Sequence, residues 1–334
     1  MGLFLLASLL ASFADVPQFV KVREEAHSKV SECRVTLSLI DRALNLRENY
    51  RYQPRDLYLL YSLKGLYEFR LMKYEVSSNS YWNALQVVES AEDPKQFQQY
   101  AIEAWLQAAR GRLTQGKTDD IISSLEQLSC KYPEIHGEQF KWLLTEYFEL
   151  QLQCACKKRD TQRIEVLVSK LFQAGIEVDE EHCLQRINAI SNAVYYSTLQ
   201  GVSIEGVNEN LMRDTLTLAR NQCGPSSAAY AKLTISNSLF LSRDGNEQQR
   251  ELCLRYIEKL VEKGKTPHEI HHVAFEVYDR GISSLIHMYD RMNDPIKAGA
   301  WSKERIDFCK NRFGVDSIEY SRAQENDFKP TAPK

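Results

Sequence analysis

The sequence predicts an all-α protein built as an α-solenoid of about six to seven helical hairpins. A paired-helix pattern returns about every 41 to 48 residues, which is typical of stacked repeats. The 14 glycines and 9 prolines among 334 residues are too few for an all-β sandwich. The first helix of each hairpin is expected to begin near one of these residues: Arg55, Gln96, Glu138, Glu181, Ser226, Pro267 and Val315.

Residues 1–54 are expected to form N-terminal capping helices. Leu3, Leu6, Leu10 and Phe13 recur at helical spacing and could cover the exposed end of the first repeat. A second interpretation stays open, because this apolar run ends in small residues and residues 1–14 could be a signal peptide, although no Lys or Arg precedes the run. The segment is too short to span a membrane, and no later run is long and apolar enough.

The first clear hairpin runs from Arg55 to Glu89. It places large and small side chains alternately, with Gly65 on the first helix and Tyr81 and Ala84 on the second. Two antiparallel helices pack closely only where a small residue on one admits a bulky side chain of the other. The small residue Gly65 therefore suits a close approach of the two helices.

The next hairpins repeat this arrangement. Trp105, Ala109 and Gly116 take the large, small and turn positions of the second hairpin, between Gln96 and Tyr132. The third hairpin joins two apolar stripes, which consist of Phe140, Leu143, Leu144, Tyr147 and Leu150 on one helix and Ile164, Leu167, Leu171 and Phe172 on the other. The spacing within each stripe indicates an amphipathic helix.

Two later turns share one pattern. A helix is expected to end at Gly224 and another at Gly314, because glycine suits the left-handed backbone of a C-cap. Ser226 and Asp316 are expected to cap the helices that follow, since their oxygens can accept hydrogen bonds from free backbone amides.

Residues 55–322 resemble the tetratricopeptide-repeat (TPR) family through Tyr61, Gly65, Tyr74, Tyr81 and Ala84, although Lys64 and Ser77 depart from the family pattern. From Glu181 onward the turns are similar to the longer repeats of the kinesin light chain type. The resemblance implies a right-handed solenoid and a non-enzymatic scaffold that binds a protein or peptide in a concave groove. The polar residues expected to line that groove on the first helices are Lys64, Gln107, Arg110, Asn188, Asn192 and Asn237.

Composition limits the classes of partner and the cellular compartment that we expect. A formal net charge of -3, from 42 basic and 45 acidic residues, gives no general attraction to nucleic acid or anionic lipid. The eight cysteines are scattered through helical segments, and no Asn-x-Ser/Thr acceptor occurs. We expect a cytoplasmic or nuclear protein; a secreted or envelope repeat protein is the alternative if residues 1–14 are a signal peptide.

One catalytic motif occurs at residues 268–272, which read His-Glu-Ile-His-His. In an HExxH motif, His268 and His272 would hold zinc and Glu269 would activate its water. Pro267 places the motif in the first turn of a helix, and no third ligand follows at a known spacing. We expect no enzyme, cofactor or metal, and keep a zinc-dependent hydrolase as an alternative.

The chain ends in a polar stretch that contains Pro330 and Pro333. Residues 323–334 are expected to form a disordered tail.

Overall fold

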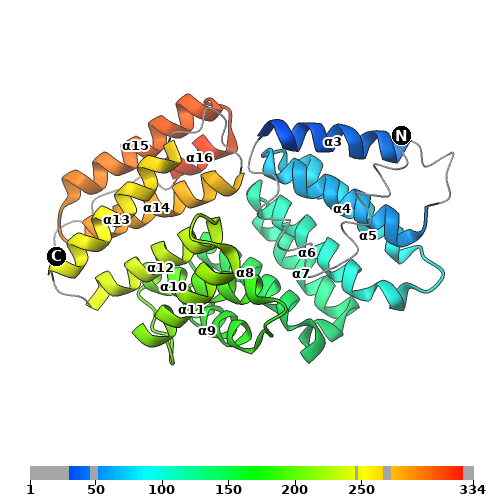
Figure 1. Cartoon of the computed structure of the whole chain (residues 1–334), viewed down its shortest axis with the longest axis horizontal. Helices are drawn as coiled ribbons and strands as arrows, with labels where there is room; N and C mark the ends of the chain where they lie inside the picture. Colours follow the sequence, from blue (N-terminus) through cyan, green and yellow to red (C-terminus); the bar gives the residue numbers. More distant parts are fainter. Residues whose placement is uncertain (1–29, 46–51, 245–246, 266–271, 326–334) are drawn as a thin grey trace. The chain divides into compact units, whose positions relative to one another are not determined.

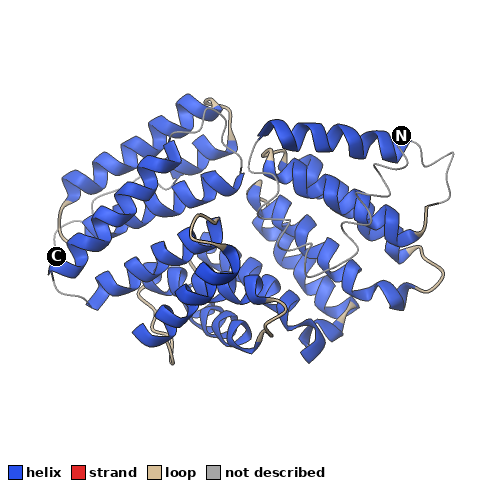
Figure 2. Cartoon of the chain, viewed as in Figure 1, coloured by secondary structure: helices blue, strands red, loops and turns tan. Residues whose placement is uncertain are grey.

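The computed structural model of the chain describes residues 30–45, 52–244, 247–265 and 272–325. Within these residues the secondary structure is helical and no strand occurs (Figure 2). The α-helices are α3 (Val30–Asn45), α4 (Pro54–Arg70), α5 (Tyr74–Glu89), α6 (Gln98–Thr114), α7 (Thr118–Lys131), α8 (Lys141–Lys158), α9 (Thr161–Glu177), α10 (Cys183–Gln200), α11 (Glu209–Cys223), α12 (Ala228–Asp244), α13 (Glu247–Lys265), α14 (His272–Arg291), α15 (Pro295–Phe313) and α16 (Ile318–Glu325). Short 3-10 helices occupy Pro94–Phe97, Pro133–His136 and Glu138–Phe140.

The chain forms two compact units (Figure 1). The N-terminal unit contains the described residues up to Ile190, together with His272, and the C-terminal unit contains the others. The division falls inside α10. The predicted all-α class is confirmed for the described part of the chain.

A continuous apolar core runs through the N-terminal unit from α4 to α8. Its fully buried side chains come from successive helices, among them Leu85, Ile102, Leu125, Leu143 and Leu150. At one end, α3 buries a second cluster against α4, in which Leu37 and Ile40 meet Leu60 and Leu63. Neighbouring helices thus share their buried surface, and burial of apolar area is the main stabilising contribution.

Alternate helices differ in exposure. Every side chain of α6 is buried or half-buried, and so is every side chain of α8 before its last two residues. In contrast, α7 and α9 each carry a stripe of exposed residues at helical spacing. A helix covered on all faces lies inside its assembly, whereas an amphipathic helix lies at the surface. The first helix of these hairpins is therefore the inner one.

The predicted close approach at Gly65 is confirmed. A Cβ atom added to Gly65 would lie 2.7 Å from the ring of Tyr81 on α5, which real Cβ atoms do not tolerate. The Ser77 hydroxyl donates to the Gly65 carbonyl at 2.7 Å. Both contacts tie α4 to α5 along the same short stretch.

The predicted helix starts agree with the structure. The first helices α4, α6, α8, α10, α12 and α16 begin within three residues of the predicted positions. Helix α14 is described from His272 onward, so the predicted start at Pro267 lies outside the described residues. The repeat of about 44 residues therefore sets where these helices begin.

The caps of the two similar turns differ from the prediction by one residue. Gly224 and Gly314 end α11 and α15 with φ of 86° and 90°, as expected of glycine. The capping oxygens, however, belong to Ser227 and Ser317, whose hydroxyls accept from the amides of the residues three positions on, at 3.2 and 3.1 Å. The assignment to Ser226 and Asp316 was therefore wrong, because the residue at the N-cap position of each following helix is the next serine in the chain.

Several expectations concern the two ends of the chain, where only part of the sequence is described. Residues 1–14, with both the capping and the signal-peptide interpretations, lie outside the described residues. Residues 323–325 do not belong to the expected tail, because α16 continues to Glu325. The rest of that expectation, residues 326–334, lies outside the described residues. Among the described helices, none is both long and apolar enough to cross a bilayer.

Candidate functional site

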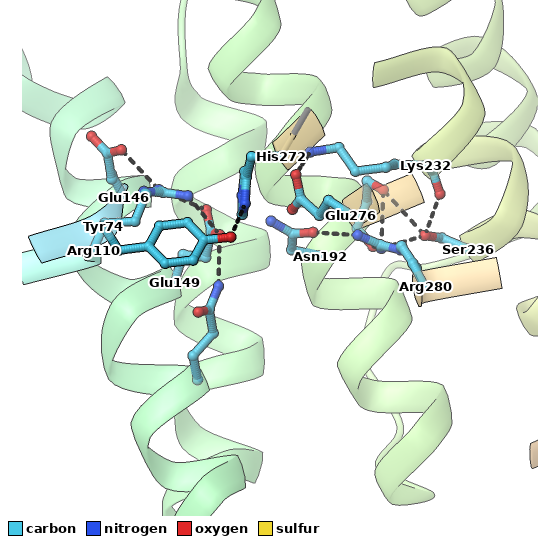
Figure 3. Close-up of polar contacts among 12 residues, drawn as sticks. Tyr74, Arg110, Glu146, Glu149, Asn192, Lys232, Ser236, His272, Glu276 and Arg280 are labelled. Carbon is cyan, nitrogen blue, oxygen red and sulfur yellow. Dashed lines mark hydrogen bonds and ion pairs between the residues drawn. The ribbon is translucent and has the colours of Figure 1, made fainter. Parts of the chain in front are cut away.

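Two polar pairs join the inner helices α6 and α8 in the N-terminal unit (Figure 3). The Gln107 amide donates to Glu146 at 2.6 Å, and the Arg110 guanidinium donates to Glu149 at 3.4 Å and to Glu146 at 2.8 Å. The two members of each pair, Gln107 with Glu146 and Arg110 with Glu149, are 39 residues apart. A constant offset means that α6 and α8 run in the same direction, since antiparallel helices would pair a later residue with an earlier one.

These contacts are partly buried. The exposed fractions of the side chains are 25% for Arg110, 16% for Glu146 and 11% for Glu149. Glu149 also accepts from Gln153 at 2.9 Å. Hydrogen bonds to charged groups are stronger when water is excluded, so this cluster fixes the register of the two helices.

The C-terminal unit contains two equivalent pairs between α12 and α14 (Figure 3). Lys232 donates to Glu276 at 3.3 Å, and Arg280 donates to the Ser236 hydroxyl at 2.6 Å. The members of both pairs are 44 residues apart. Helices α12 and α14 therefore also run in the same direction. We call these four pairs the polar rungs.

Arg280 is the most enclosed charge of the rungs, with 7% of its surface exposed. Its guanidinium donates to Asn192 at 2.6 Å and to the carbonyl of Ser191 at 2.8 Å. It also lies 4.0 Å from the centre of the Tyr195 ring, a cation–π geometry. Burial raises the pKa of Tyr195 to about 12, against the opposing effect of Arg280. Neutral acceptors and an aromatic face hold this cation inside the unit.

The six predicted groove residues have different surroundings. Gln107, Arg110 and Asn192 belong to these polar contacts, while Lys64 pairs with Asp41 of α3 at 2.7 Å. Asn188 on α10 and Asn237 on α12 are half-buried and have no hydrogen-bond partner among the described residues. An amide without a protein partner can still donate to and accept from a ligand.

The HExxH motif is described only at its second histidine. His272 Nδ1 lies 3.1 Å from the hydroxyl oxygen of Tyr74, and its ring centre lies 4.3 Å from that of Phe69. His268 and Glu269 lie outside the described residues. Over the part of the chain that the structure covers, no three His, Cys, Asp or Glu side chains are grouped so as to hold a metal ion. Aromatic contacts therefore account for the described position of His272.

No protein-family model matches the chain, and no curated protein does so at a significant level.

No local motif in the sequence marks the carboxylates that bind Gln107 and Arg110, and none marks Arg280. The repeat period was the available signal, because residues 39 or 44 positions apart occupy neighbouring inner helices. A search for complementary polar residues at the predicted period of 41 to 48 residues would have found the two pairs of the C-terminal unit, which are 44 residues apart, but not the two pairs that are 39 residues apart.

Proposed function

We propose that the chain is a right-handed TPR-like α-solenoid of six to seven hairpins that acts as a non-enzymatic scaffold for protein–protein interaction. The regular starts of the inner helices carry this proposal. The polar rungs support it, because helices of equal direction and constant offset belong to hairpins stacked in one orientation. Such stacking produces extended surfaces that suit a protein or peptide partner.

Two half-buried amides are each proposed to contact a partner: Asn188 in the N-terminal unit and Asn237 in the C-terminal unit. Both lie on inner helices, and no described group satisfies their hydrogen-bonding capacity. Lys64, Gln107, Arg110 and Asn192 are proposed to shape the surface through the contacts given above, because those contacts already use part of their hydrogen-bonding capacity.

The proposal includes a cytoplasmic or nuclear location. All eight cysteines are free thiols, and three of them, Cys33, Cys154 and Cys309, are buried. Thiols of this kind are usual in reducing compartments.

A matched pair of double variants tests the scaffold function. The tagged chain is expressed in its native cells, bound proteins are captured after cross-linking, and the captured partner is purified for titration calorimetry. Replacing both Asn188 and Asn237 by alanine is expected to weaken the affinity for the partner about tenfold, because the hydrogen bonds of both amides are lost. The control replaces Asn79 and Asn83 by alanine, since these residues are exposed on the outer helix α5. Equal losses in both variants, or a loss only in the control, would reject the inner-helix surface.

A further inference from the structure

The C-terminal unit contains a pocket of about 190 Å³ that is rich in arginine. Arg243 and Ser242 come from the end of α12, Arg250 from the start of α13, and Arg291 from the end of α14. Met288 and Met292 complete the described lining. Three cations from three helices thus surround one small space.

Helix stability accounts for two of these arginines but not for the third. Arg243 and Arg291 lie in the last turns of their helices, where a positive charge interacts favourably with the helix dipole. Arg250 lies near the N-terminal end of α13, where the dipole favours a negative charge. The nearby acid Glu251 is bound to Arg255 at 2.6 Å. The helix dipole therefore does not stabilise Arg250 at this position.

The hydrogen bonding of Arg250 also favours an acceptor from outside the chain. Its Nε atom is buried and has no hydrogen-bond partner, and no described side chain forms an ion pair with it. A buried donor without an acceptor is destabilising. An anion in the pocket would supply acceptors to the Arg250 guanidinium.

We propose that this pocket binds the phosphoryl group of a phosphoserine or phosphothreonine in a partner protein. Arginine forks match phosphate oxygens, and clusters of arginine are a general means of recognising phosphorylated motifs. The proposal rests on the scaffold function given above.

One exposed apolar side chain in the lining favours a peptide over a free anion. Met292 lines the pocket and is 41% exposed. Methionine adapts to varied apolar side chains, which a peptide provides and inorganic phosphate does not. The residues next to the phosphorylated one are therefore expected to include an apolar side chain.

The test uses the full-length chain and a fluorescein-labelled library of phosphoserine peptides with random flanking residues. An enriched sequence is then measured by fluorescence anisotropy in phosphorylated and unphosphorylated forms. We expect the phosphorylated form to bind about tenfold tighter or more, and Arg250→Gln to remove about the same factor. Arg250→Lys, which keeps the charge but loses the fork, is expected to restore part of the affinity.

Arg255→Gln is the matched control, because Arg255 lies on the same helix but is exposed and paired with Glu251. It is expected to bind as the unmodified chain does. If Arg250→Gln does not fold, as judged by circular dichroism, Arg291→Gln replaces it, since Arg291 is exposed.

Three outcomes would overturn the proposal: equal binding of both peptide forms, full binding by the folded Arg250→Gln or Arg291→Gln variant, or competition by inorganic phosphate at the peptide's own concentration. The last outcome would assign the pocket to a free anion. If a captured partner depends on Asn188 and Asn237 but is insensitive to phosphatase and to Arg250→Gln, the scaffold function stands and the phosphate site fails. If phosphopeptides bind while no partner depends on the two asparagines, the phosphate site stands and the proposed inner-helix contact surface fails.

Discussion

Gly281 on α14 provides a direct test of how closely the hairpins pack. A Cβ atom added there would lie 2.8 Å from Val261 Cγ2 of α13, with Ile257 and Ile235 methyl groups at 3.7 and 3.8 Å. All three side chains are completely buried, and valine is stiff about χ1. The added methyl group therefore cannot be accommodated by a small side-chain movement, and the helices must separate.

Two opposing effects set the expected magnitude for Gly281→Ala. Alanine is favoured over glycine within a helix by about 1 kcal/mol, whereas overpacking a closed core costs about 1–3 kcal/mol. We expect overpacking to dominate and to lower the free energy of unfolding by up to about 2 kcal/mol. In a domain of this size the melting temperature would fall by about 2–4 °C per kcal/mol.

Gly299→Ala is the matched control in the same unit. Gly299 lies inside α15, and an added Cβ would have no atom of a neighbouring element within 4 Å. The helix-propensity gain then acts alone and should raise the free energy of unfolding by about 0.5–1 kcal/mol. Urea denaturation followed by circular dichroism, with the slopes compared, measures both. If the two variants shift in the same direction, the close contact between α13 and α14 is wrong.

Three further predictions concern buried polar groups. Arg280→Met should lower the free energy of unfolding in urea by about 2–4 kcal/mol, because it leaves buried partners unsatisfied. The control Arg255→Met, at an exposed pair, should change the free energy of unfolding by less than about 0.5 kcal/mol. Equal effects of the two variants would contradict the burial of Arg280. Burial raises the pKa of Glu68, so the native state binds the proton of this carboxyl group more tightly than the unfolded state does. The free energy of unfolding should therefore fall as pH rises from the unfolded pKa of about 4.3 through the native pKa. The urea midpoints of Glu68→Gln should not show this fall. Burial raises the pKa of Cys309 to about 12, so iodoacetamide at pH 8 should modify the exposed Cys130 first, and equal labelling by mass spectrometry would disprove this protection.

Contacts inside one hairpin could be predicted from the sequence because they depend on local spacing alone. Gly65 and Tyr81 face each other as expected, since the turn between two helices fixes which residues meet. The contacts of Gln107 and Arg110 could not be predicted in this way. Their carboxylate partners lie in the next hairpin, and that pairing depends on the rotation of one inner helix relative to another, which side-chain packing determines.

The function-related residues were harder to predict for the same reason. Asn192 was expected to face a ligand, but it accepts a hydrogen bond from Arg280, which lies 88 residues away. The arginine pocket joins the ends of three helices, and no local motif marks such a meeting point. Arg250 could have been noticed from its position near a helix start, where a basic residue is unusual.

The polar rungs show how neighbouring hairpins are oriented within each unit. On each pair of inner helices the rungs are three or four residues apart, and the offset between partners does not change within a unit. A helical bundle with neighbouring antiparallel helices would reverse the order of the partners from one rung to the next. The observed order requires each outer helix to return the chain to the same end before the next inner helix begins. This requirement supports the solenoid that we propose, and it implies that a partner bound along the inner helices meets the same direction of helix in successive hairpins of each unit.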